Sequence, residues 1–229
     1  MNRHLKAASI LAIAIFATSN AHAKLIGVSG PVSTGGTAPA IIDSPSDLLD
    51  DLVTNDGMRG FDEALGVVTT INHPMDGGAV LAAGTRVDSH MIFLNSEGPT
   101  ALMHYGVTWT FDGLILGVMS DRGGLLEASS TFELGAPTTN YTATASGTGA
   151  AAPFDARGLE RNRGGNGTGD GYGVNGNQII VDMYVTEPGD WIRVITASNT
   201  NDVPEPGTLA LLGLGLLGFG RARRWARRD

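Results

Sequence analysis

Hydrophobic and polar residues alternate along several stretches of the chain, as they do in β-strands with one buried face. In the stretch YGVTWTFDGLILGVMSD, Val107, Trp109 and Phe111 fall on one side, and threonines fall on the other. The Asp-Gly pair at 112–113 is typical of a hairpin turn. Residues 114–119 are therefore predicted to return as the partner strand.

The stretch NQIIVDMYVTEPGDWIRVITAS follows the same plan. One face of its first half is apolar and consists of Ile179, Val181, Met183 and Val185. A Pro-Gly pair within 187–190 suits a type II turn, and 191–196 is predicted as the next strand. Weaker alternation predicts four further strands, at 65–71, 85–94, 125–134 and, as an edge strand, 140–145.

One helix is predicted, in the stretch DSPSDLLDDLVTNDG that begins at Asp43. Ser44 suits the cap, Pro45 the first helical position and Asp47 the first turn, and leucines at 48, 49 and 52 supply an apolar face. Residues 146–177 are rich in glycine and are expected to form one long loop. Many short strands and one short helix indicate an all-β protein with a single, jelly-roll-like β-sandwich.

Composition supports this fold and narrows the function. The 229 residues include 33 glycines, which suit turns, and no cysteine, which excludes disulfides, thiolate metal sites and cysteine nucleophiles. The formal net charge is −8, and residues 24–202 alone hold 8 basic and 21 acidic residues. A body this acidic repels phosphate backbones, so no nucleic-acid partner is expected.

The first 23 residues have the pattern of a secretory signal peptide. Arg3 and Lys6 form a positive start, an apolar run covers 7–17, and Ala21-His22-Ala23 is a small-x-small cleavage site with Ala21 and Ala23 as its small residues. The pattern predicts entry into the translocon, cleavage by signal peptidase and a mature chain from Lys24.

The last 27 residues contain a short apolar run between a proline motif and a basic cluster. The run, 208–220, spans about 20 Å as a helix, less than the roughly 30 Å hydrocarbon core of a bilayer. Glycines within it weaken a permanent anchor. The cluster that follows favours the cytoplasmic side and consists of Arg221, Arg223, Arg224, Arg227 and Arg228.

This order of parts closely resembles the PEP-CTERM protein-sorting signal. The resemblance implies that an exosortase recognises Pro204, Glu205 and Pro206, that 209–219 hold the chain transiently in the membrane, and that the arginines stop transfer. It also implies export across the inner membrane of a Gram-negative bacterium, delivery to the cell surface or matrix, and an association with exopolysaccharide and biofilm. A plain tail anchor is the alternative. The chain thus divides into 1–23, 24–202 and 203–229.

Four segments of the body, VTNDGMRGFDEA, AAGTRVDSHMIFLNS, TWTFDGLILGVMSD and VTEPGDWIRVITA, resemble an extracellular domain type that recurs in proteins with this tail. The resemblance implies one domain and no particular chemistry.

Candidate chemistry in the body is sparse. Asp56, Asp62 and Glu63 are oxygen ligands suited to a structural calcium ion, although their spacing is not that of an EF-hand, and surface carboxylates are the alternative. GGNGTGDGYG lacks the ending of a phosphate loop and carries Asp170 one place late for a calcium-binding nonapeptide. No other cofactor is expected.

His73, His90 and His104 lack a metal-binding spacing, so ordinary packing is favoured over a zinc site. Five aromatic residues are candidates for a sugar-stacking face, with Trp191 the best candidate for exposure and Trp109 for the core: Tyr105, Trp109, Tyr172, Tyr184 and Trp191. No residue is assigned a catalytic role. The expected function is a non-enzymatic surface protein; the alternatives are a carbohydrate-binding module for exopolysaccharide and a secreted hydrolase.

Overall fold

The computed structural model describes residues 23–48, 55–96, 100–141, 158–159, 169–186 and 189–198. They belong to one compact unit, 22–199. Its elements, in chain order, are β1 (Leu25–Ser29), β2 (Ala40–Ile41), β3 (Arg59–Asp62), β4 (Val67–Val68), β5 (His73–Pro74), the 3₁₀ turn η1 (Asp76–Gly78), β6 (Val80–Leu81), β7 (Arg86–Leu94), β8 (Leu102–Phe111), β9 (Ile115–Met119), α1 (Leu125–Leu134), β10 (Gly171–Asn175), β11 (Gln178–Val185) and β12 (Asp190–Ala197).

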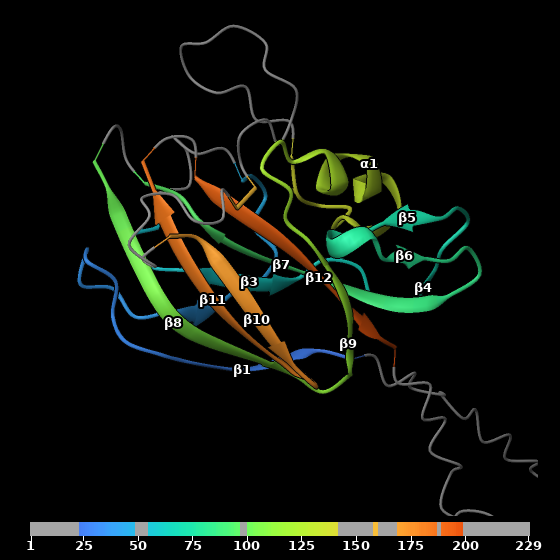
Figure 1. Cartoon of the computed structure of the whole chain (residues 1–229), viewed down its shortest axis with the longest axis horizontal. Helices are drawn as coiled ribbons and strands as arrows, with labels where there is room; N and C mark the ends of the chain where they lie inside the picture. The colour runs from blue at the N-terminus through green and yellow to red at the C-terminus, as the bar shows by residue number, and fades with distance from the viewer. Residues whose placement is uncertain are drawn as a thin grey trace, which may run out of the picture. The chain divides into compact units, whose positions relative to one another are not determined.

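The long strands form two sheets that lie one in front of the other (Figure 1). The first sheet has the order β1-β8-β11-β10, and the second has the order β2-β3-β7-β12-β9 with β4 also paired to β7. All pairings are antiparallel except the short parallel contact of β2 with β3. A small separate ladder joins β5 and β6. The expectation of an all-β fold with one helix is confirmed in this form.

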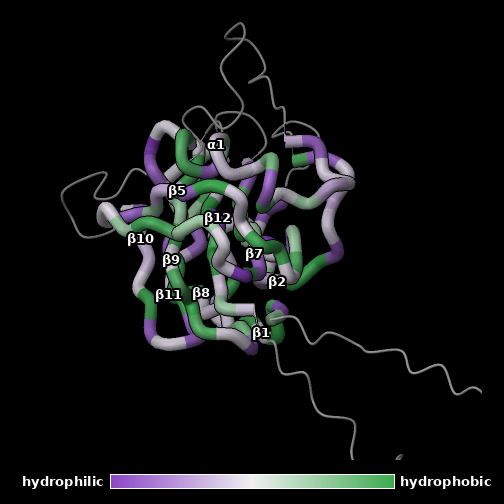
Figure 2. Tube along the Cα trace, turned by 90° about the vertical axis from the view of Figure 1, so that its right-hand side faces the viewer, coloured by the Kyte–Doolittle hydropathy of each residue, from purple (hydrophilic) through white to green (hydrophobic). Residues whose placement is uncertain are grey.

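The main core lies between the two sheets and draws on both. The faces predicted from alternation are buried as expected, at 107, 109 and 111 on β8 and at 179, 181, 183 and 185 on β11. From the second sheet, Ile92, Ile192 and Val194 pack into the same cluster. The colours of Figure 2 change between hydrophobic and hydrophilic over short stretches, as expected for strands buried on one face.

The turn predicted as a hairpin at 112–113 connects the two sheets instead. β8 and β9 belong to different sheets, so the prediction that 114–119 pairs with 107–111 is wrong. Gly113 is needed for close approach: a Cβ there would lie 2.4 Å from the Ala197 carbonyl oxygen and 2.7 Å from the Ala23 Cβ. β11 and β12 are likewise divided between the sheets, and a Cβ on Gly189 would lie 2.2 Å from the Asn95 side-chain oxygen.

A true hairpin lies in the segment that the sequence pattern assigned to a loop. β10 pairs with β11, and Asn175 faces Gln178 across a two-residue turn. Gly176, with φ +64°, adopts the left-handed conformation that such a turn requires. The prediction of one loop over 146–177 is therefore wrong for 171–175; most of its earlier residues lie outside the described part of the chain.

The helix forms at 125–134, where a strand was predicted. The Asp121 carboxylate accepts the N–H groups of Leu125 and Leu126 at 3.1 and 2.7 Å and so satisfies the first helical turn. The buried side of the helix carries Glu127, Ser130 and Leu134, while leucine and phenylalanine at 125 and 132 are exposed. Hydrophobicity alone misidentifies this helix because its buried face is mostly polar.

The helix predicted from Ser44 does not form in the described residues. Ser44 donates its hydroxyl to the Asp62 carbonyl, and Asp47 forms an isolated parallel bridge with Asn140. Residues 49–54 lie outside the description. The predicted strand at 85–94 is confirmed as β7, that at 65–71 shrinks to β4, and 140–145 contributes only the Asn140 bridge before the description stops at 141. Among the described residues, no helix is long and apolar enough to cross a membrane.

Candidate functional site

The three predicted calcium ligands do not come together. Glu63 directly follows β3 and points under α1, whereas its neighbour Asp62 points to the opposite face of the sheet, as strand geometry requires. Asp56 is exposed in the loop before β3. In the part of the chain that the structure describes, no group of three or more histidine or acidic side chains is placed to hold a metal ion.

Asp62 instead binds a histidine inside the sandwich. His90 is fully buried and contacts the Asp62 carboxylate at 2.8 Å and the Thr196 hydroxyl at 3.0 Å through its two ring nitrogens. Burial raises the pKa of Asp62, but hydrogen bonds from His90 and the Leu25 N–H, with nearby positive charge, outweigh it. The pKa of Asp62 therefore lies below its ordinary value, and the carboxylate stays ionised as an acceptor.

The other two histidines also have local partners. His73 contacts the Glu133 carboxylate of α1 at 2.7 Å, which connects β5 to the helix. His104 accepts the Met58 N–H at 2.9 Å and contacts the Pro31 carbonyl at 2.9 Å; burial is the main cause that lowers its pKa. Each histidine thus has its own partners, and ordinary packing accounts for all three.

A buried ion pair attaches α1 to the second sheet. Arg193 on β12 is fully buried and forms a two-pronged contact with Glu63, at 2.7 and 2.8 Å. Tyr141 and Ser89 donate to the same carboxylate at 2.6 and 2.8 Å. The guanidinium also donates to the Glu127 carbonyl at 2.7 Å and to the Ser130 hydroxyl at 2.6 Å. Every one of these contacts is internal, so the cluster serves the fold and not a ligand.

Glu127 lies beside this cluster but, unlike Glu63, does not form an ion pair with any described residue. Its side chain is buried, and neither carboxylate oxygen has a hydrogen-bond partner. Burial raises the pKa of Glu127 well above its ordinary value, and the negative charges of Asp121 and Asp76 add to this effect against the positive charge of Arg193. Glu127 is therefore held in its protonated, neutral form over a pH range in which an exposed glutamate is ionised.

Two of the aromatic candidates are core residues. Trp109 is fully buried, and its ring lies so close to Gly60 that a Cβ there would be 2.5 Å from it. The expectation that Trp191 is exposed is wrong. Trp191 is fully buried in a cluster with Leu48, Phe61 and Tyr141, and it donates its indole N–H to Asn95 at 2.9 Å. Tyr172 packs against the core and donates its hydroxyl to Asp76 at 2.9 Å.

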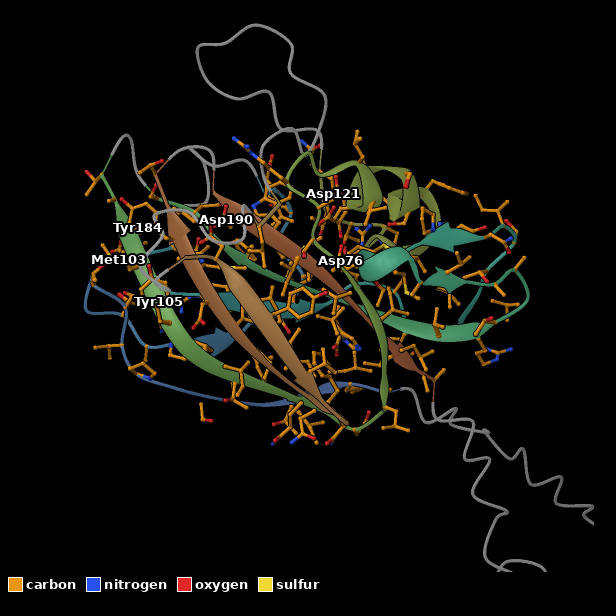
Figure 3. The ribbon with its side chains drawn as sticks, in the orientation of Figure 1. Asp76, Met103, Tyr105, Asp121, Tyr184 and Asp190 are labelled. Atoms are coloured by element: carbon orange, nitrogen blue, oxygen red, sulfur yellow. The ribbon has the colours of Figure 1, made fainter. Side chains whose placement is uncertain are left out.

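The remaining two tyrosines share an outward face of the first sheet. Tyr184 on β11 faces Met103 on β8, and Tyr105 lies two residues further along β8; all three are half-buried. Figure 3 shows these three side chains at the same end of the two strands. We call Met103, Tyr105 and Tyr184 the tyrosine patch.

Carboxylates border the tyrosine patch. A bulge at Gly106, with φ +68°, interrupts the β8–β11 pairing, and Asp182 accepts the Gly106 N–H at 2.5 Å. Asp170 accepts the Tyr184 N–H. Burial, Asp170, Asp182 and Tyr184 raise the pKa of Tyr105, so its phenol stays protonated and can donate. Strict alternation from Val107, Trp109 and Phe111 would place Tyr105 on the buried face of β8. The bulge at Gly106 turns it outward instead, and this bulge has no clear signal in the sequence.

A polar hollow lies at the end of the sandwich next to this patch. Its volume is about 290 Å³, and its lining includes Thr34, Asp56, Ser96 and Thr100. The loop after β1 reaches it because the Met103 carbonyl accepts the Thr34 N–H at 2.9 Å. At about 290 Å³ the hollow lies at the lower limit of small-molecule sites, which usually measure about 300–1,000 Å³. Among the ligands predicted for calcium, Asp56 alone borders it.

The predicted sorting and stop-transfer residues, and Ala21 of the cleavage site, lie outside the described residues. The comparison with protein families bears on that part of the chain. Residues 202–224 match the family described as the PEP-CTERM protein-sorting motif. The resemblance read from Pro204, Glu205 and Pro206 is thereby confirmed. No curated protein and no solved structure matches the chain significantly.

Proposed function

We propose that this chain is a non-enzymatic protein of the cell surface or extracellular matrix of a Gram-negative bacterium, associated with exopolysaccharide and biofilm. The observation that carries the proposal is the PEP-CTERM motif at 202–224. The motif marks the chain as an exosortase-targeted exported protein that is held transiently in the membrane before release to the surface.

The terminal segment performs the sorting in three steps. As a helix, the short apolar run would be about 20 Å long against a core of roughly 30 Å, so we propose that it holds the chain in the bilayer only transiently. The five arginines keep the end of the chain on the cytoplasmic side. Because proline disfavours a helix, we propose that the Pro-Glu-Pro motif stays outside the membrane, where the exosortase cuts near it.

Replacing Pro204, Glu205 and Pro206 with alanines tests the sorting proposal. The tail is expected to stay attached, so that intact-mass measurement of the membrane fraction finds the C-terminal arginines. The matched control replaces Asn199, Thr200 and Asn201, which lie before the match, and is expected to be processed normally. Unchanged tail removal and surface delivery in the motif variant would overturn the assignment.

A second candidate function is carbohydrate binding, and the tyrosine patch favours it. Aromatic rings pack against the C–H faces of sugars, and the half-buried Asp182 carboxylate beside the rings is an acceptor for a sugar hydroxyl. The adjoining hollow adds hydroxyl and carboxylate groups. Because residues 24–202 carry a net charge of −13, we propose a neutral polysaccharide, not an anionic one.

A glycan array probed with the exported protein tests this second function. Neutral oligosaccharides are expected to be bound, and Tyr105→Ala with Tyr184→Ala is expected to lower the affinity about tenfold or more. Tyr105→Phe with Tyr184→Phe keeps the rings and serves as the matched control for stacking. Equal binding by wild type and the alanine variant, or binding of anionic glycans only, would contradict the assignment.

The two glutamates of the cluster under α1 do not support the hydrolase alternative. Glu63 and Glu127 are buried beneath α1, where no substrate reaches them. Glycoside hydrolysis needs two carboxyl groups on either side of an accessible bond. The proposal therefore keeps a binding role ahead of a catalytic one.

The proposed jelly-roll-like connectivity accords with how often the chain changes sheets. Its long strands pass from the first sheet to the second after β1, return at β8, and change again at β9, β10 and β12. Such repeated crossing is characteristic of double-sheet Greek-key and jelly-roll proteins.

A further inference from the structure

Three carboxylates hold the point at which the chain enters the fold. The backbone N–H groups of Ala23, Lys24 and Leu25 donate to Asp88, Asp112 and Asp62 at 2.6, 2.5 and 2.9 Å. The three acceptors come from three separate segments of the chain: β7, the corner after β8, and the end of β3.

Ala23 is an integral part of this arrangement. It is fully buried, and its Cβ packs at the corner where Gly113 has no side chain. Its acceptor Asp88 is also fully buried and receives a second N–H from Gly66. Loss of Ala23 would remove one donor from a buried carboxylate and open the corner beside Gly113, and both changes disfavour the folded state.

We propose that signal peptidase cuts between Ala21 and His22, so that the mature protein begins at His22 and keeps Ala23. The inference rests on the proposed function, because it requires export. Water adds across the Ala21–His22 peptide bond, which leaves a carboxylate on Ala21 of the leader and an α-ammonium on His22. That positive charge stands one residue before a site that already collects three carboxylates.

The leader contains two overlapping sites at which signal peptidase could cut. Ser19-Asn20-Ala21 places small residues at the −3 and −1 positions for a cut before His22, just as Ala21-His22-Ala23 does for a cut before Lys24. The small-x-small rule for signal peptidase sites is met by both cuts. The fold distinguishes them, because only the first cut leaves the Ala23 N–H available to Asp88.

N-terminal peptide mass spectrometry of the full-length chain, exported by a Gram-negative host, tests the inference. The expected first residue is His22. A chain that begins mainly at Lys24 would overturn the inference and leave export intact. A chain that keeps Met1 and its leader would overturn the inference together with the exported role.

A pair of leader variants sharpens the test without touching the mature protein. Ser19→Leu places a large residue at −3 of the proposed site only and is expected to abolish the His22 start. Asn20→Leu, at the tolerant middle position, is the matched control and is expected to keep it. Normal processing of Ser19→Leu would overturn the inference, since Ser19 lies outside the site that yields Lys24.

Discussion

The two faces of the second sheet are buried by opposite means. On the inner face, Ile92, Ile192 and Val194 join an apolar core shared with the first sheet. On the outer face, the same strands present Ser89 and Arg193, which form a hydrogen-bonded cluster with Glu63 under α1. The inner face therefore gains stability from area removed from water, while the outer face depends on every buried charge having a partner.

The comparison also shows why α1 sits where it does. Apolar contacts tolerate small shifts, but a guanidinium held between Glu63 and the carbonyl and hydroxyl groups of α1 is satisfied in one arrangement. Smaller apolar clusters, around Phe61 with Trp191 and around Met119 with Leu134, flank the ion pair and exclude water from it. The outer face thus fixes the position of α1, and the inner face buries most of the apolar surface.

The largest expected effect comes from breaking the outer face. Arg193→Met leaves the Glu63 carboxylate buried without its cation and is expected to lower the free energy of unfolding by about 3–5 kcal/mol. Urea unfolding followed by tryptophan fluorescence measures it. The double variant Arg193→Met with Glu63→Gln removes both charges and is expected to recover part of the loss. A double variant less stable than the single one would contradict the view of Glu63 as an uncompensated charge.

A pH-dependent effect on stability should distinguish Glu127 from Glu133 on the same helix. Because the folded state holds the Glu127 proton to higher pH than the unfolded state, its favourable contribution is complete below about pH 4.5 and falls as pH rises towards the folded pKa. Between these two pKa values, the free energy of unfolding falls by up to about 1.4 kcal/mol per pH unit. Glu127→Gln is expected to lack this slope and to be more stable than wild type at neutral pH.

Glu133→Gln on the same helix is the control of opposite sign. Burial raises the pKa of Glu133, but hydrogen bonds from Thr70 and His73 outweigh it, so the pKa of Glu133 lies below its ordinary value. Its contribution is present above the unfolded pKa and is lost as pH falls through the folded one. Thermal unfolding from about pH 2 to pH 9 compares the two variants, because the Glu133 effect lies below about pH 4.5. Equal pH profiles would refute the difference between them.

The smallest effect is expected on the inner face. Ile192→Val removes one methylene from the apolar core and is expected to cost about 0.5–1.5 kcal/mol at every pH. The same denaturant titration at two pH values measures it. A cost that changes with pH would show that the inner face is coupled to the charged cluster, contrary to the division drawn above.

Strand faces were predictable from the sequence, whereas strand partners were not. The buried sides of 107–111 and 179–185 follow from alternation because the two sides of a strand differ by a single residue step. Whether the next strand pairs or crosses depends on contacts from far along the chain, such as those of Gly113 with Ala197 and of Gly189 with Asn95. A turn signal contains no information on those contacts.

The candidate site shows the same limit. Alternation places Tyr184 outward but would place Tyr105 on the buried face with Val107. The outward position of Tyr105 and its meeting with Tyr184 depend on the β8–β11 register and its bulge. Trp191 was misjudged because its exposure is decided by the cover over the second sheet, which comes from distant segments.

By itself the sequence determined the sorting signal at 202–224, the all-β class and the faces of the main strands. Each of these is a property of contiguous residues. The membrane and the exosortase recognise the tail, and a hydrophobic period of two marks the strand faces. The tertiary structure alone decided the division of neighbouring strands between two sheets, the polar underside of α1 and the burial of Ala23. Each of these depends on partners that lie far apart in sequence and meet only when the chain folds.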